Sequence, residues 1–178
     1  MRNFLGLALP DSTKTDLERI CFGLEEIRWV SPENFHTTLV FLGELKQEEI
    51  ERVSEICSEV SEKSFSLEIN GVGVFGNKAP EILYVGVALS EGLKKLQKVL
   101  ESTLRRQGFQ IDKRDYRPHI TIGRFKRAPE KRLDLYLKEF EGFKTDIVPV
   151  SEFQLFSSRS GANGQIYSVE ESYPLLSE

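Results

Sequence analysis

Hydrophobic and polar positions follow two periods along the chain, and these periods alternate. Apolar residues recur every three or four positions, as on one face of an α-helix, at 12–23, 47–63, 92–107 and 129–140. Short runs rich in Val, Ile, Leu and Phe predict β-strands at 3–8, 35–42, 65–69, 82–89, 118–125, 147–156 and 166–171, with a return segment at 27–30. Gly and Pro punctuate 71–81 and 157–165, which predicts loops there.

Strand 35–42 alternates regularly enough to assign its two faces. One face is predicted to hold Phe35, Thr37, Leu39 and Phe41, and the other His36, Thr38, Val40 and Leu42. The helix at 129–140 starts with Pro129, a residue favoured in the first helical turn.

The elements come twice in a similar order: a strand, a helix, and then a strand that carries a histidine. This order favours an α+β fold, with one bilobal domain over residues 1–178. We expect a pseudo-two-fold arrangement of two antiparallel sheets, with helices on the outer faces and a central cleft. The helices at 47–63 and 92–107 are each expected to cover the sheet of their own half.

The composition is that of an ordinary folded protein, with 39% hydrophobic and 29% charged residues in 178. The apolar run near the N-terminus is interrupted by Pro10 and Asp11, and no later run reaches about 18 residues, so no membrane span is expected. Cys21 and Cys57 form no metal or disulfide motif, and both are expected to be buried free thiols. We expect a cytoplasmic monomer without a cofactor.

Charge is unevenly distributed in a chain whose net charge is −4. Residues 113–132 hold eight cations against Asp115 and Glu130; the cations are Lys113, Arg114, Arg117, Arg124, Lys126, Arg127, Lys131 and Arg132. A basic segment in an acidic protein suits a ligand that bears phosphate, although a solvated strand and loop have the same composition.

Both histidines of the chain lie in the same local pattern, His-x-Thr-aliphatic, at His36-Thr37-Thr38-Leu39 and His119-Ile120-Thr121-Ile122. With seven Thr in the chain, a double match by chance is expected about once in ten thousand trials, which is the false-positive risk of the motif. In a strand, residues i and i+2 share a face, so each motif places an imidazole beside a hydroxyl.

Two such strands facing each other can cleave a phosphodiester without a metal. One neutral imidazole accepts a proton, while its partner, kept charged by a phosphate, donates one. The hydroxyls of Thr38 and Thr121 can donate to phosphate oxygens. A metal site held by His36 and His119 lacks a third ligand at a suitable spacing.

The sequence resembles the 2H phosphoesterase superfamily, and within it the RNA 2′,3′-cyclic phosphodiesterases, also called 2′-5′ RNA ligases. The resemblance rests on RNFLGLALP, IRWVSPENFHTTLVFLGE, GVGVFGN, ILYVGV, RPHITIGRFKR and FQLFSSRSGANGQIYSVEESYPL, and covers nearly the whole chain. It implies a bilobal α+β fold whose two motifs line a central cleft.

The resemblance also implies roles for single residues. His36 corresponds to the proton donor and His119 to the proton acceptor, and the partner is an RNA with a 2′,3′-cyclic phosphate end, hydrolysed to a 2′-phosphate with possible reverse 2′-5′ ligation. Arg124 matches an arginine that follows the second motif. Strict alternation points Arg124 away from His119, but a bulge at Gly123 would turn it back.

Two alternatives remain open at this stage. One is a noncatalytic module that binds RNA ends, and the other is an enzyme that acts on another cyclic or 2′,5′-linked phosphodiester. Phe4, Phe41 and Phe75 could stack on a base, although core packing is the simpler expectation for each. The GVGVFG segment lacks the features of a P-loop and is interpreted as a connection.

Overall fold

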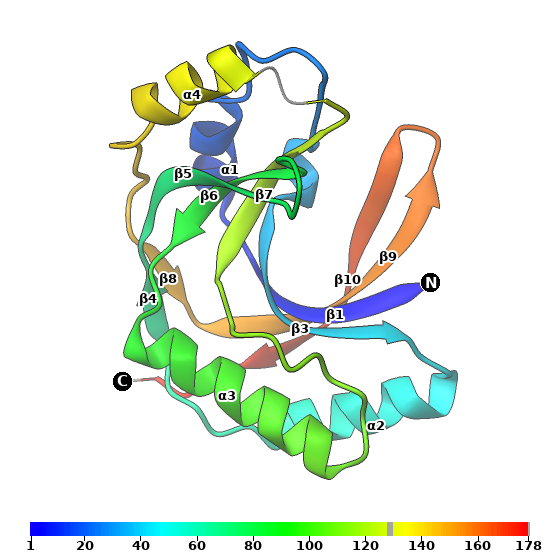
Figure 1. Cartoon of the computed structure of the whole chain (residues 1–178). Coiled ribbons are helices and arrows are strands. Elements are labelled where there is room, and N and C mark those ends of the chain that lie inside the picture. Colours follow the sequence, from blue (N-terminus) through cyan, green and yellow to red (C-terminus); the bar gives the residue numbers. More distant parts are fainter. Residues whose placement is uncertain (128–129, 178) are drawn as a thin grey trace.

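The computed structural model describes residues 1–127 and 130–177 and is shown in Figure 1. Its helices in these ranges are α1 (Asp11–Glu18), the 3₁₀ turn η1 (Pro32–Asn34), α2 (Gln47–Ser58), α3 (Glu91–Arg106) and α4 (Glu130–Glu139). Its strands are β1 (Arg2–Ala8), β2 (Ile27–Trp29), β3 (His36–Glu44), β4 (Phe65–Leu67), β5 (Ile69–Phe75), β6 (Ile82–Val87), β7 (His119–Phe125), β8 (Val148–Val150), β9 (Glu152–Gly161) and β10 (Gly164–Pro174).

The strands form two main sheets and one small one. The first sheet has the order β10-β9-β1-β3 and the second β2-β7-β6-β5, while β4 pairs with β8. All named strand pairs are antiparallel. The expected α+β fold with two antiparallel sheets is therefore confirmed.

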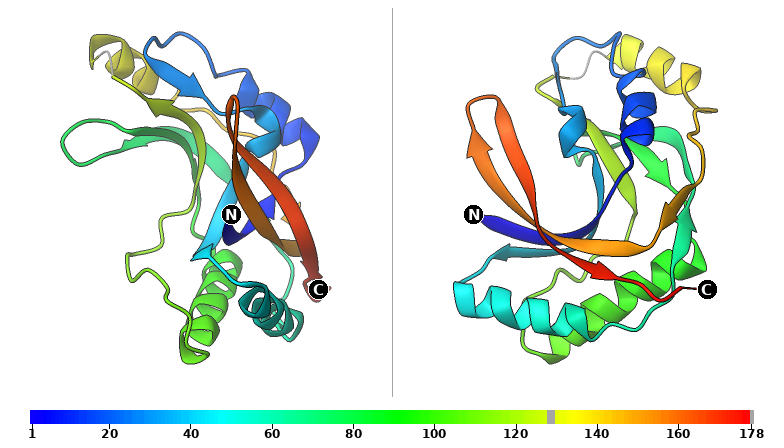
Figure 2. Two further views of the ribbon diagram at one scale, coloured as in Figure 1. Left: turned by 90° about the vertical axis from the view of Figure 1, so that its right-hand side faces the viewer. Right: turned by 180° about the vertical axis from the view of Figure 1, so that it is seen from behind.

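The helices lie on the outside of this pair of sheets, as Figure 2 shows. Helix α3 presents one buried face of four leucines, spaced as its sequence predicts, and Ser90 caps its first turn by accepting a hydrogen bond from the Leu93 amide. This helix contacts α2 and β3, which belong with the first sheet. The expectation that the helix at 92–107 covers the sheet of its own half is wrong, because the chain crosses back to the first sheet after β6.

The sequence predicts a loop at 71–81, but the first half of this segment is strand β5. A side-chain Cβ at Gly73 would overlap the Tyr84 hydroxyl oxygen, so the Tyr84 ring covers the backbone of the neighbouring strand. Glycine is thus required for close packing here and does not signal a turn.

The loop expected at 157–165 is also wrong, because β9 and β10 run through this segment and leave only a two-residue turn at 162–163. The hairpin is largely exposed and polar, so no hydrophobic alternation reveals it. Helices α1 and α2 end several residues before the predicted limits at 23 and 63. The prediction for Pro129 lies outside the described residues.

Strand β3 does not keep the alternation that its sequence predicts. The pairing with β1 shifts between Leu5 and Gly6, so that Leu39 is an extra residue in β3, and a second shift follows at Phe4. Leu39 and Val40 are consequently both buried, whereas Phe41 is 63% exposed. The predicted face assignment is correct up to Leu39 and wrong beyond it.

Candidate active site

The two His-x-Thr motifs begin the strands at which the two main sheets meet, β3 of the first sheet and β7 of the second. His36 is the first residue of β3, and His119 is the first residue of β7. The hydroxyl of Thr37 donates a 2.9 Å hydrogen bond to the main-chain carbonyl of His119, so the two strand starts touch. Figure 1 shows β3 and β7 side by side at this point. We call His36, Thr38, His119, Thr121 and Arg124 the two-histidine site.

Each imidazole is held in the same way by the chain just before it. Nδ1 of His36 lies 2.7 Å from the carbonyl oxygen of Asn34, and Nδ1 of His119 lies 2.7 Å from that of Arg117. A carbonyl oxygen only accepts, so Nδ1 carries the proton in both rings. Nε2 is therefore the atom of each ring that can exchange a proton with a ligand.

The threonines of the two motifs have different surroundings. Oγ1 of Thr38 lies 3.1 Å from Nε2 of His36, as expected for residues i and i+2 on one strand face. Thr121 lies two residues after His119 in β7, opposite Tyr84 of β6, and is half-buried. A phosphate bound at Nε2 of His36 would take over the hydrogen bond of the Thr38 hydroxyl.

Burial lowers the pKa of His36 from its ordinary value to about 4. The Asn34 carbonyl opposes this shift, while the charges of His119, Arg124 and Lys14 add to it. Burial also lowers the pKa of His119, against the Arg117 carbonyl and with the charge of Arg124. Both imidazoles are thus neutral at pH 7 without a ligand, and a bound phosphate anion raises their pKa values.

Arg124 lies on the strand face opposite to the one that strict alternation assigns. In the pairing of β7 with β6, Leu83 faces Gly123 but Tyr84 faces Thr121, so Ile122 is an extra residue. Ile122 and Gly123 are both buried and Arg124 is exposed. The charge of Arg124 lowers the pKa values of both histidines, which places it near both rings.

Aromatic rings surround both imidazoles. The rings of Phe4, Tyr167 and Phe156 have centroids 4.7, 5.0 and 5.7 Å from that of His36. Around His119, the centroids of Phe75 and Tyr84 lie at 4.9 and 5.6 Å. These rings remove water from the imidazoles, which accounts for the burial that lowers their pKa values.

The three phenylalanines considered from sequence have different surroundings. Phe4 is buried and stacks on Phe156, so packing is its role. Phe75 is half-buried and stacks on Tyr84 beside His119. Phe41 is exposed, and the expectation of core packing is wrong for it.

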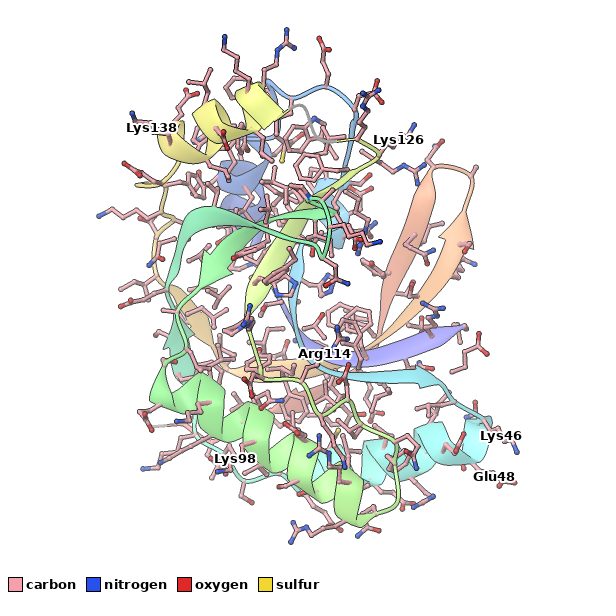
Figure 3. The ribbon with its side chains drawn as sticks, in the orientation of Figure 1. Lys46, Glu48, Lys98, Arg114, Lys126 and Lys138 are labelled. Carbon is pink, nitrogen blue, oxygen red and sulfur yellow. The ribbon has the colours of Figure 1, made fainter. Side chains whose placement is uncertain are left out.

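The basic segment 113–132 does not form one surface. Figure 3 shows Arg114 near α3 and Lys126 at the far end of β7. Lys113 and Arg114 line a groove of about 590 Å³ along α3. Of the eight cations, all of them within the described residues, only Arg124 acts through its charge on the pKa values of the two histidines.

No group of three or more His, Cys, Asp or Glu side chains suited to a metal ion occurs in residues 1–127 and 130–177. Within the same ranges, no helix is long and apolar enough to cross a membrane. Cys21 and Cys57 are free, and burial raises the pKa of both thiols to about 12.

Asn34 was missed by sequence reasoning and connects His36 to the far end of the chain. Its side-chain amide donates a 2.7 Å hydrogen bond to the carbonyl of Gln165 and accepts one of 3.3 Å from the amide of Tyr167. Its own carbonyl holds Nδ1 of His36. Asn34 therefore docks the β9–β10 hairpin beside His36.

Replacing Asn34 by alanine is expected to lower kcat about tenfold, because two hydrogen bonds of about 0.5–1.5 kcal/mol each cease to fix the carbonyl that orients His36. Asn34→Asp is expected to raise kcat/KM on the alkaline side of its pH profile, since a carboxylate raises the pKa of the nearby His36 imidazole, which must be protonated for the reaction. Asn163→Ala, in the exposed turn of the same hairpin, is the control. A wild-type kcat together with an unchanged pH profile in both Asn34 variants contradicts this role.

The fold and the paired strands place the chain in the class of two-histidine α+β proteins that its sequence resembles. Residues 10–162 match the family described as the 2′-5′ RNA ligase superfamily. This chain belongs to that superfamily.

Two similar proteins carry the name RNA 2′,3′-cyclic phosphodiesterase. The one from Archaeoglobus fulgidus is 32% identical over 171 residues, which cover 94% of this chain and 96% of the relative. The one from Thermotoga maritima is 35% identical over 176 residues, which cover 95% and 92%. A crystal structure of a Thermus thermophilus protein, 24% identical, matches with a TM-score of 0.82 over 98% of this chain and 97% of that one, and so shows the same fold.

Proposed function

We propose that this chain hydrolyses RNA 2′,3′-cyclic phosphate ends to 2′-phosphates. The observation that carries the proposal is the pair of imidazoles on two strands joined by the hydrogen bond from Thr37 to the His119 carbonyl. In each ring a carbonyl holds Nδ1, so Nε2 is the nitrogen left for proton exchange, and in His36 it lies beside the Thr38 hydroxyl. The names of the relatives from A. fulgidus and T. maritima support the same substrate.

In the proposed reaction, Nε2 of His119 takes a proton from a water molecule as its oxygen attacks the cyclic phosphorus. The bond between phosphorus and the 3′ oxygen breaks, and Nε2–H of His36 gives its proton to that oxygen. The products are a 2′-phosphate and a 3′-hydroxyl, and one proton has passed from His36 to the product and one from water to His119. Exchange with solvent restores both rings.

The anion itself supplies the protonation that the reaction needs. Without a ligand, His36 is neutral at pH 7, and its Nε2 then carries no proton that it could donate to the leaving oxygen. The negative phosphate raises the pKa of the imidazole it touches, and His36 then carries the proton when substrate is bound. Thr38, Thr121 and Arg124 are proposed to hold the non-bridging oxygens, and Arg124 also opposes premature protonation of His119.

The proposal also covers the state of the protein. We propose a single bilobal domain over residues 1–178, a monomer, and a cytoplasmic location. The first is supported by the hydrogen bond between Thr37 and His119 and by a chain that passes between the sheets several times. The free thiols of Cys21 and Cys57 suit a reducing compartment.

The test is to incubate the pure protein in EDTA with a short RNA that ends in a 2′,3′-cyclic phosphate. We expect turnover to persist at the rate seen without chelator, because two imidazoles supply both proton transfers. The product, compared with synthetic standards by ³¹P NMR, should be the 2′-phosphate.

Each other outcome contradicts a part of the proposal. Loss of turnover in EDTA that a divalent ion restores shows a metal-dependent reaction. A 3′-phosphate product reverses the assignment of the leaving oxygen. Binding of the RNA end without turnover indicates a noncatalytic module.

A further inference from the structure

Arg28 and Arg124 are direct neighbours across two strands. Arg28 is the central residue of β2, and its pairing partner in β7 is Arg124. Cross-strand partners point to the same side of a sheet, and like charges in this arrangement destabilise it. No carboxylate forms an ion pair with either arginine among residues 1–127 and 130–177.

The packing on the opposite side of these strands fixes which face the two arginines share. A Cβ at Gly123 would lie 2.5 Å from Ile27 and 3.3 Å from Trp29, so these residues face the interior together. Arg28 lies between Ile27 and Trp29 and is exposed, as Arg124 is. The side chains of both arginines therefore leave the second sheet on the face that bears the two-histidine site.

Arg28 is farther from the reacting centre than Arg124. The charge of Arg124 lowers the pKa values of both histidines, whereas Arg28 has no such influence. Along β7, Arg124 is three residues beyond Thr121, or about 10 Å at the usual rise of a strand. Arg28 thus stands next to the two-histidine site without being part of the position that the cyclic phosphate takes, whereas Arg124 belongs to that site.

We propose that Arg28, with Arg124, forms a second anion site, which binds the internucleotide phosphate on the 5′ side of the terminal nucleotide. This inference rests on the proposed function and names the substrate more closely: an RNA chain of at least two nucleotides. Arg124 lies between the two phosphates and Arg28 contacts only the second. Guanidinium groups suit this task because they bind phosphate oxygens with two parallel hydrogen bonds.

The experiment compares three substrates with wild type and Arg28→Gln. They are a nucleoside 2′,3′-cyclic phosphate, a dinucleotide with the same cyclic end, and that dinucleotide with an uncharged methylphosphonate between its nucleosides. For the dinucleotide, we expect Arg28→Gln to lower kcat/KM about tenfold through KM, because the contact is the same in ground and transition states. For the mononucleotide and the methylphosphonate, kcat/KM should change less than twofold.

Two controls separate binding from structure. Arg159→Gln removes the same charge from β9. Arg159 follows Ser158, the pairing partner of Tyr167, and the substitution should leave kcat/KM unchanged for all three substrates. The melting temperature of Arg28→Gln should equal or exceed that of wild type, since a repulsive pair is removed. Arg28→Lys should recover part of the lost dinucleotide kcat/KM.

An equal loss on mononucleotide and dinucleotide overturns the second site, and so does a loss that persists with the methylphosphonate. If wild type turns over none of the substrates, the proposed function fails, but the second site is still tested. In that case the dissociation constant of a dinucleotide with a 2′-phosphate end is measured. Arg28→Gln should raise it about tenfold with a natural internucleotide phosphate and leave it unchanged with the methylphosphonate.

Discussion

Replacement of His36 or His119 by alanine is expected to lower kcat on a cyclic-phosphate RNA by about 10²–10⁴-fold, while the protein stays folded. General acid or base assistance has this magnitude for a single group. Both rings are bonded to main-chain carbonyls at the start of their strands, so their loss removes proton transfer and leaves the sheets paired. Steady-state kinetics, with far-UV circular dichroism as the control for folding, measures the effect.

The two losses should not add. The proposed reaction moves both protons around one phosphorus, so the double variant should be about as slow as the slower single variant. A double variant slowed by the product of the two factors shows that the imidazoles act independently. A single variant with near-wild-type turnover contradicts the mechanism and favours the noncatalytic module.

The pH dependence follows from the directions of the two pKa shifts. The wild-type kcat/KM should trace a bell, because His119 must be neutral and His36 protonated. In the free protein the pKa of His36 is lowered to about 4 and that of His119 also lies below its ordinary value, so both limbs lie below about pH 6.5. The bell for kcat should lie at higher pH, since the bound phosphate raises both values. A flat profile from about pH 5 to 9 contradicts this.

Replacement of Arg124 by alanine is the second large effect, an expected loss of about 10- to 100-fold in kcat/KM on the mononucleotide and a loss at least as large on the dinucleotide. A hydrogen bond to a charged group contributes about 1.5–3 kcal/mol, and Arg124 is proposed to make one to the reacting phosphate. Because the charge of Arg124 lowers the pKa values of both histidines, its removal raises them and moves the kcat/KM bell to higher pH.

Arg124→Lys keeps the charge and is expected to keep the pH profile, with a smaller loss of kcat/KM because lysine lacks the paired donors. Arg127→Ala, in the exposed segment just after β7, is the control for a changed net charge. An unshifted bell in Arg124→Ala would mean that the guanidinium does not act on the imidazoles.

The sequence located the two strands that carry the histidines, but it did not predict the faces of all their residues. The repeated His-x-Thr pattern located both strand starts, because a period of two on a strand fixes which side chains share a face. The prediction went wrong after Leu39, where an extra residue reverses the alternation and exposes Phe41. A bulge arises from the pairing of two strands, so the hydrophobic pattern of one strand alone does not reveal it.

Long-range partners were beyond sequence reasoning for a related reason. Asn34 is bonded to residues 131 and 133 positions away, on a hairpin whose polar, exposed strands lack a hydrophobic period. Strand β5 was missed because its glycines resemble a loop, whereas Tyr84 of the next strand covers Gly73. Both are cases in which tertiary packing overrides local preference.

The hydrogen bond from the Thr37 hydroxyl to the His119 carbonyl has a consequence for motion during turnover. It joins the starts of the two strands that carry the imidazoles. A second hydrogen bond, from the Tyr116 hydroxyl to the Thr38 carbonyl, lies beside it. A hinge between the sheets would have to break both bonds and open the apolar contacts around them. The spacing between donor and acceptor is thus set before substrate arrives, which is the pre-organisation that favours a fast chemical step. Bringing the two imidazoles to their working distance then needs no movement of one sheet against the other, unlike the domain closure that limits many other enzymes.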